Sequence, residues 1–146
     1  MKVRRHLNRE NIILDLRAKT KETVIEEIVD NLVETGKIKN KEKALKAVLE
    51  REKKMTTGMQ HGVAIPHGKT DSVDELVTAI AIKKDGIDFD SMDKLPSKIF
   101  IMTISPSSHS GPHIQFLAEV SKVLKSEDAR QQFLSAKKEE DIINIF

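Results

Sequence analysis

Apolar residues in the first third of the chain recur with the spacing of amphipathic helices. A helix is predicted from a cap at Thr20 to about Thr35, because its apolar positions follow a period of about 3.6 residues. These positions are Val24, Ile25, Ile28, Val29, Leu32 and Val33. Gly36 is a suitable C-terminal stop. A second helix is predicted from a cap at Asn40 to about Lys54. Its inward positions are expected to be Ala44, Leu45, Val48 and Leu49.

Short apolar runs predict the strands. IILDL over 12–16 indicates a short strand, and the runs VTAIAI over 77–82 and IFIMTI over 99–104 indicate two more. Because the last two are almost continuously apolar, we expect them to be covered on both faces. The turn residues Lys84-Asp85-Gly86 are expected to end the strand at 77–82. The polar stretch 55–75 predicts a long loop around one short strand, Val63–Ile65.

The C-terminal part of the chain is predicted to be helical. Pro112 falls where a helix would begin, a position that favours proline. The buried side of this helix is expected to carry Ile114, Leu117, Val120 and Leu124. Two short helices are expected near 128–136 and 138–145. Strands interleaved with helices are typical of α/β proteins, and without a linker or an internal repeat we expect one domain over residues 1–146.

Composition excludes several classes of function. The chain has 146 residues, 38% hydrophobic and 33% charged, as in globular proteins. Aromatic residues are only 3%, all phenylalanine, so the stacking platform of single-stranded nucleic-acid binders is missing. The 25 basic and 23 acidic residues are interspersed, which argues against a DNA-binding surface. We therefore expect no nucleic acid among the partners.

The absence of cysteine and of long apolar segments bears on location and chemistry. Without cysteine there are no disulfides, no thiolate catalysis and no cysteine-based zinc site. The N-terminal MKVRRHLNRE lacks the apolar region of a secretory signal, and no stretch approaches the roughly 20 apolar residues that cross a bilayer. These features predict a cytoplasmic protein that does not insert into a membrane.

The segment GVAIPHGK, residues 62–69, is the strongest candidate for chemistry. Pro66 fixes its own φ at about −65° and favours an extended residue before it, so we expect the strand to stop at Ile65. His67 would then project from a stiff loop at a strand end, where ligands of α/β proteins usually bind. Gly68 would let its backbone approach a ligand closely and leave its N–H accessible. The alternative is a structural turn in which His67 merely caps a carbonyl.

A second histidine, His113, is expected in the first turn of the helix that begins near Pro112. Free N–H groups and a partial positive charge make a helix N-terminus suitable for anions and oppose protonation of an imidazole there. A neutral imidazole is a competent nucleophile, and two of them beside a helix N-terminus would suit a transient phosphoryl group. The alternative is a helix-start histidine that contacts only solvent.

The residues around His67 carry a resemblance to a known family. Arg51-Glu52, Thr57-Gly58 and Gly62–Gly68 resemble the active-site region of enzyme IIA of the phosphoenolpyruvate-dependent sugar phosphotransferase system, in its fructose, mannitol and nitrogen-regulatory class. The resemblance covers the whole chain. It implies an α/β fold with a single mixed β-sheet of about five strands and helices on both faces. The implied activity is that of a phosphotransferase component with a phosphohistidine intermediate.

Carried over residue by residue, the resemblance implies that His67 accepts the phosphoryl group on Nε2. His113 would sit beside it and stabilise the phosphate. Arg51 matches an arginine near the same pocket, although a solvated charge at a helix end is the plainer interpretation. Glu52 receives no role. One departure from the family pattern is Gln60, which stands where a small residue is usual and alters the loop before the strand.

The family also implies partners and leaves alternatives open. The donor would be an HPr-like phosphocarrier and the acceptor a IIB domain, with no metal and no cofactor. Within the family, a nitrogen-type protein would instead regulate targets through the phosphorylation state of His67. A zinc site built from the imidazoles at 61, 67, 109 and 113 is disfavoured, because Gly111-Pro112 interrupts the helical spacing. A third possibility is a binding module with an inert pocket.

Overall fold

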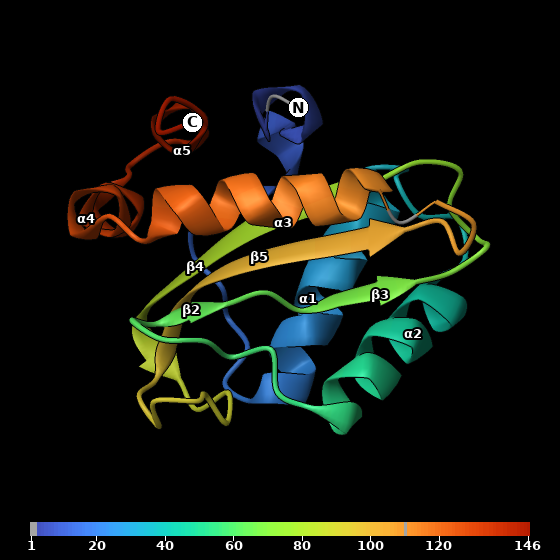
Figure 1. Cartoon of the computed structure of the whole chain (residues 1–146), viewed down its shortest axis with the longest axis horizontal. Helices are drawn as coiled ribbons and strands as arrows, with labels where there is room; N and C mark the ends of the chain where they lie inside the picture. The colour runs from blue at the N-terminus through green and yellow to red at the C-terminus, as the bar shows by residue number, and fades with distance from the viewer. Residues whose placement is uncertain (1–2, 110) are drawn as a thin grey trace.

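The computed structural model describes residues 3–109 and 111–146, whose elements are arranged around one mixed β-sheet (Figure 1). The strands are β1 (Ile12–Ile13), β2 (Val63–Ala64), β3 (His67–Lys69), β4 (Val77–Ile87) and β5 (Ser97–Ser105). Their order is β1-β4-β5-β2, and β3 also pairs with β5. The pair β4–β5 is antiparallel, whereas the other pairs are parallel. The expected mixed sheet of about five strands is confirmed.

Helices cover both faces of this sheet. They are α1 (Lys21–Glu34), α2 (Lys41–Lys54), α3 (Gly111–Leu124), α4 (Glu127–Ser135) and α5 (Glu139–Ile143), preceded by the short 3-10 turns Val3–His6 and Arg9–Asn11. Figure 1 shows α3 running over one face of the sheet while α1 lies behind it. None of the helices in the described part of the chain combines the length and apolar character that crossing a membrane requires.

Alternation along β5 divides the apolar interior into two clusters. Ile99 and Ile101 pack with the helices α3 to α5, whereas Phe100, Met102 and Ile104 pack with α1 and α2. A strand buried on both faces needs apolar residues at every position. This explains the continuous apolar run that predicts β5 in the sequence.

The two N-terminal helices begin at the predicted caps. Thr20 accepts a hydrogen bond from the Thr23 amide, and the Thr23 hydroxyl accepts one from the Thr20 amide, which forms a reciprocal capping box. The Asn40 side chain accepts from the Lys43 amide at 3.1 Å. Gly36 lies just beyond α1 with φ at +78°, a conformation that favours glycine. Local capping chemistry therefore sets these boundaries.

Two of the predicted element limits are wrong. β4 continues through the expected turn at 84–86 to Ile87, where it pairs with Ser97. Gly86, at φ +79°, lies within a register irregularity of this hairpin and does not end the strand. The edge strand β1 covers only residues 12–13, not 12–16 as predicted. In β4, pairing with β5 overrides the local turn signal.

The predicted buried side of α3 is also partly wrong. Ile114 is 63% exposed, and the buried positions are His113, Phe116, Val120 and Leu124. Hydrophobicity alone selects Ile114, because a histidine is not expected on the inward stripe of a helix. The polar partner that makes His113 acceptable there comes from β5 and is described below.

The segment 63–69 follows β5 in one unchanged register. Val63 pairs with Ile99, Ala64 with Phe100, and the pairing resumes after Pro66 with His67 opposite Thr103. The Pro66 carbonyl still accepts a hydrogen bond from the Thr103 amide at 3.2 Å. β2 ends at Ala64, close to the expected stop at Ile65, whereas the expectation that His67 lies in a loop is wrong, because a further strand, β3, begins at His67. Proline removes one donor but already has the extended backbone that an edge strand requires.

Replacing Gly68 by alanine should destabilise the fold. A Cβ at Gly68 would lie 3.0 Å from the Ala47 carbonyl carbon and from the Val48 amide nitrogen, both in the backbone of α2. Because a helix backbone yields little, we expect Gly68→Ala to lower the free energy of unfolding by about 1–3 kcal/mol in urea titrations. Gly111→Ala is the control, since a Cβ there meets nothing within 4 Å. An unchanged midpoint for Gly68→Ala would contradict this packing.

Candidate active site: a histidine pair at the sheet edge

Three polar residues lie side by side across the sheet, on the face that α3 covers. His67 lies opposite Thr103 in the β3–β5 register, and Thr103 lies opposite Thr78 in the β4–β5 register. Both threonines are buried. Successive side chains of a strand point to opposite faces, so His67 faces α3 when Gly68 faces α2. The strand register thus brings His67 toward the first turn of α3.

His113 comes down from that first turn and is itself buried. Only 6% of its surface is exposed, and its Nδ1 lies 2.9 Å from the Thr103 hydroxyl oxygen. A buried imidazole without a partner would be costly, and Thr103 supplies that partner from the middle strand. The interpretation of His113 as a histidine that contacts only solvent is therefore wrong.

The two histidines that the sequence predicts are brought together. The ring centroids of His67 and His113 lie 5.0 Å apart, with an angle of 42° between the ring planes. His67 is half-buried, less accessible than the outward-pointing ring expected from the sequence. One imidazole comes from an edge strand and the other from a helix start, which are 46 positions apart in the printed sequence.

The backbone determines which nitrogen of His67 is free. The Nδ1 of His67 lies 2.9 Å from the carbonyl oxygen of Ile65. Because a carbonyl oxygen only accepts hydrogen bonds, Nδ1 must carry the proton and donate it. The Nε2 of the neutral ring then keeps its lone pair. The structure thus leaves Nε2 as the ring nitrogen with the free lone pair.

Both imidazoles are held neutral at physiological pH. Burial is the main cause that lowers the pKa of His67, assisted by the positive charges of Arg51 and Lys69. The hydrogen bond to Ile65 and the negative charge of Glu52 oppose this shift. Burial also lowers the pKa of His113 to about 4, together with the neighbouring charges of His67 and Lys69. Such a pair suits chemistry that needs unprotonated imidazole.

Arg51 and Gly68, the other two residues of the predicted pocket, lie in the last turn of α2 and in β3. Arg51 is half-buried near the end of α2, and its Nη1 donates to the Met55 carbonyl at 2.8 Å. Its positive charge is a smaller contribution to the lowered pKa of His67, after burial. Gly68 is buried, and the missing side chain makes room for the α2 backbone. The expected accessible approach of a ligand to Gly68 is therefore not what its surroundings show.

Two polar residues near the pair, Thr103 and Glu52, have no role in the prediction from the sequence. Thr103 is the one hydroxyl residue in the run IFIMTI, and this interruption is a signal that could have identified it. Glu52 is buried at 6% exposure and continues the inward stripe of Ala44 and Val48 on α2. A charged residue at an inward helical position is the corresponding signal.

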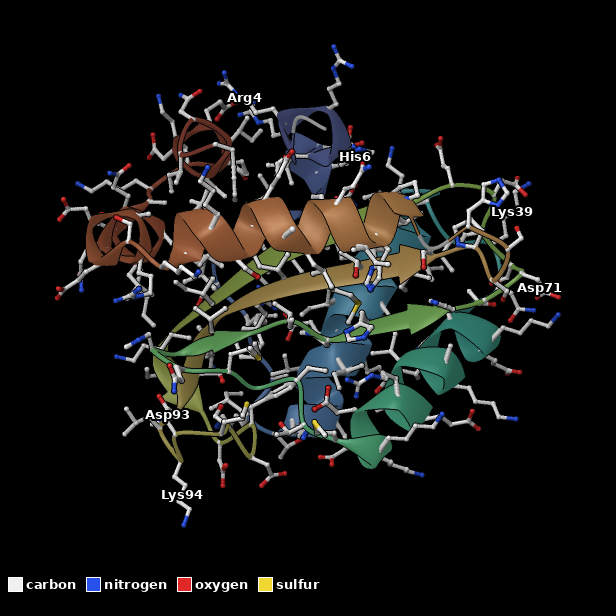
Figure 2. The ribbon with its side chains drawn as sticks, in the orientation of Figure 1. Arg4, His6, Lys39, Asp71, Asp93 and Lys94 are labelled. Atoms are coloured by element: carbon white, nitrogen blue, oxygen red, sulfur yellow. The ribbon has the colours of Figure 1, made fainter. Side chains whose placement is uncertain are left out.

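The remaining candidates for a metal site do not join the pair. The backbone amide of His61 donates to the Asp93 carboxylate. Figure 2 shows Asp93 on the opposite side of the molecule from Asp71, which follows shortly after β3 and its residue His67. His109 is exposed in the turn after β5. Within residues 3–109 and 111–146, no group of three or more histidine, aspartate or glutamate side chains is arranged to hold a metal ion.

Comparison with known proteins places this chain in a family. Residues 5–146 match the family model described as "Phosphoenolpyruvate-dependent sugar phosphotransferase system, EIIA 2". A fructose-specific EIIA component of Haloferax volcanii is 39% identical over 126 residues, covering 86% of this chain and 82% of the relative. A fructose-specific EIIABC component of Bacillus subtilis is 36% identical over 145 residues, which cover 99% of this chain and 23% of that longer protein.

Solved structures show the same fold. The nitrogen regulatory protein IIA-Ntr of Neisseria meningitidis superposes with a TM-score of 0.87 at 23% identity, covering 98% of this chain and 97% of that one. The IIA chain in the complex of enzyme IIAMTL with phosphorylated enzyme IIBMTL from Escherichia coli superposes with a TM-score of 0.81 at 24% identity, covering 95% of each. On the match of the family model and the relatives, this chain belongs to the EIIA 2 family of the phosphoenolpyruvate-dependent sugar phosphotransferase system.

Proposed function

We propose that this protein is a cytoplasmic phosphoryl carrier in which Nε2 of His67 accepts a phosphoryl group from an HPr-like phosphocarrier and passes it to a IIB component. The observation that carries the proposal is the orientation of His67. Its Nδ1–H is held by the Ile65 carbonyl at 2.9 Å, and its ring lies 5.0 Å from that of His113. This geometry leaves a fixed lone pair beside a second polar ring.

The transfer balances without a cofactor. The lone pair of His67 Nε2 attacks phosphorus, the P–N bond of the donor phosphohistidine breaks, and the donor nitrogen keeps that bonding pair. The phosphorylated ring still carries its proton on Nδ1, and the Ile65 carbonyl continues to accept it. This carbonyl stabilises the positive charge that the ring acquires. In the second transfer, a nucleophile of the acceptor attacks phosphorus, the P–Nε2 bond breaks, and Nε2 of His67 keeps the bonding pair.

His113 is proposed to stabilise the phosphoryl oxygens. When the Thr103 hydroxyl donates to His113 Nδ1, the proton of that neutral ring resides on Nε2 and is available to an anion. Arg51 adds positive charge near the same ring. Phosphoryl transfer depends mainly on such positioning and charge stabilisation.

The sugar system is proposed from the relatives. Two fructose-specific proteins, at 39% and 36% identity, favour fructose uptake as the process that this carrier serves. The second candidate is regulation through the phosphorylation state of His67, favoured by a nitrogen regulatory protein of Bradyrhizobium diazoefficiens at 28% identity over 137 residues. Rapid transfer from the phosphorylated chain to a cognate IIB supports transport, whereas no transfer to any IIB of the organism supports regulation.

The partner surface is proposed to include the loop 56–61 beside the site. A groove of about 400 Å³ is lined by residues of this loop, of β2 and of the end of α3. Met59 and Met92 at its rim are 40% and 65% exposed. Flexible, polarisable methionine side chains suit a surface that must fit two different proteins in turn. The unusual Gln60 also lines this groove and would affect that fit.

Removing the proposed nucleophile should abolish phosphorylation. After incubation with phosphoenolpyruvate, enzyme I and HPr, intact-mass spectrometry should show one acid-labile phosphoryl group on the wild-type chain and none on His67→Ala. His109→Ala is the matched control, because His109 is an exposed histidine outside the pair. Acid-labile phosphate on His67→Ala would contradict the assignment.

Removing the second imidazole should slow transfer but leave the acceptor in place. We expect His113→Ala to become phosphorylated and then to pass the group to IIB on the order of 10- to 100-fold more slowly, because one stabilising donor is lost. Rapid-quench measurement of the transfer step tests this. Complete loss of labelling would show that His113 has a different role.

The pair should titrate at unusually low pH. Since burial disfavours the charged rings, NMR titration should place the pKa of His67 below the ordinary histidine value and that of His113 at about 4. As the pH falls, His67 becomes mostly protonated only below its own lowered pKa. Phosphorylation of His67 should therefore persist below the pH at which free imidazole is half protonated. A pKa of either ring above the ordinary value would contradict this electrostatic analysis.

A further inference from the structure

Glu52 is a buried carboxylate near the proposed site, and its hydrogen-bond and ion-pair partners are Thr57 and Lys21, not the histidine rings. It is the one acidic residue with 6% exposure or less among those that the structure describes. Its Oε2 accepts from the Thr57 amide at 2.7 Å and its Oε1 from the Thr57 hydroxyl at 2.5 Å. The Lys21 ammonium lies 3.0 Å from Oε2. Every bond of this carboxylate thus ties α2 to the loop after it or to α1.

Such an arrangement is costly and needs a reason. Taking a carboxylate out of water is unfavourable unless hydrogen bonds and an opposite charge compensate it. Here one residue, Thr57, supplies two donors to the two oxygens, which fixes both its peptide and its side chain. Thr57 is itself buried at 3% exposure. The consequence is a rigidly placed backbone segment at the start of the loop.

This segment covers the outer edge of β2, the strand that leads through Ile65 and Pro66 to His67. The Met59 amide donates to the Val63 carbonyl at 2.7 Å, and the Ile65 amide donates to the Thr57 carbonyl at 3.0 Å. β5 occupies the other edge of the strand. Because Pro66 has no amide hydrogen, Ile65 is the last residue before His67 that can bond in this way. The position of Ile65 therefore depends on Thr57.

The connection reaches the nucleophile through one more bond. The Ile65 carbonyl accepts from Nδ1 of His67 at 2.9 Å. Glu52 thus fixes Thr57, the Thr57 carbonyl accepts from the Ile65 amide, and the Ile65 carbonyl keeps the imidazole proton on Nδ1. All the links are hydrogen bonds of ordinary length between fixed groups.

We propose that Glu52 is a positioning residue for the phosphoryl acceptor, acting through Thr57 and Ile65 to keep His67 in the tautomer with the proton on Nδ1 and the lone pair on Nε2. The inference rests on the proposed role of His67. The charge of Glu52 acts in the same place, because it raises the pKa of His67 against the effects of burial and Arg51. Loss of that charge would lower the pKa of His67 further.

The test is Glu52→Gln, with Glu50→Gln as the matched control. Glutamine keeps the volume but offers one acceptor oxygen and presents an NH₂ group, so one of the two Thr57 donors is left unpaired. Glu50 is an exposed glutamate on the same helix. Nitrogen NMR of the unphosphorylated chain reports the tautomer of His67. We expect the Nδ1–H form to dominate in wild type and in Glu50→Gln, and its fraction to fall in Glu52→Gln.

Kinetics give a second readout. We expect single-turnover phosphorylation of Glu52→Gln by phospho-HPr to slow by about 10- to 100-fold, because the attacking atom is no longer held in place. The acid limb of its pH profile should move to lower pH, in the direction set by the lost charge. A residue that serves only stability would leave the tautomer fraction of His67 unchanged in the folded protein, whereas the movement of the acid limb reports the lost charge alone.

Substitutions of Thr57 keep the proposal testable if Glu52→Gln does not fold. Thr57→Ser retains both bonds to Glu52 and should match wild type, whereas Thr57→Val loses the hydroxyl bond and should lower the Nδ1–H fraction of His67. An unchanged tautomer in folded Glu52→Gln, or in Thr57→Val, would overturn the proposal. Absence of phosphorylation in wild type would instead refute the proposed function, since the tautomer is measured without phosphoryl transfer.

Discussion

The pairing of residues 63–69 with β5 in a single register is the constraint on which the rest of the site depends. It keeps β2 and β3 in the same register on either side of Pro66, so that successive side chains alternate between the two helical layers. Gly68 then meets the backbone of α2, and His67 meets α3. A slip of one residue would exchange the two and place an imidazole against the backbone of Ala47, where even a Cβ atom would lie only 3.0 Å from the helix.

The second feature of the site is that buried polar groups are paired one with another. His113 has Thr103, His67 has the Ile65 carbonyl, and Glu52 has Thr57 and Lys21. These partners come from β5, from the edge strand and from the loop after α2. Because the groups are removed from water, their charges and protons respond to each other more strongly than on a surface. Low histidine pKa values and a defined tautomer follow from the same burial that stabilises the sheet.

Much of the secondary structure could be predicted because its causes are local. Thr20 and Asn40 cap the helices that follow them, and the runs at 77–82 and 99–104 form the two central strands. The failures have a common origin in contacts with distant residues. Gly86 lies inside a hairpin strand because β4 and β5 pair again beyond it. Ile114 faces solvent because His113, which has a hydrogen-bond partner in Thr103, takes the buried position of that helix turn.

The sequence by itself determined that this protein has two histidines in special surroundings, one after a proline and one at a helix start, and it identified the family through the motif around His67. Those features are readable because proline geometry and helix capping act over a few residues. Only the tertiary structure decided that the two rings lie 5.0 Å apart, which nitrogen of His67 is free, and that Glu52 is buried behind the loop. Each of these depends on strand register and on hydrogen bonds between segments that the chain brings together only when it folds.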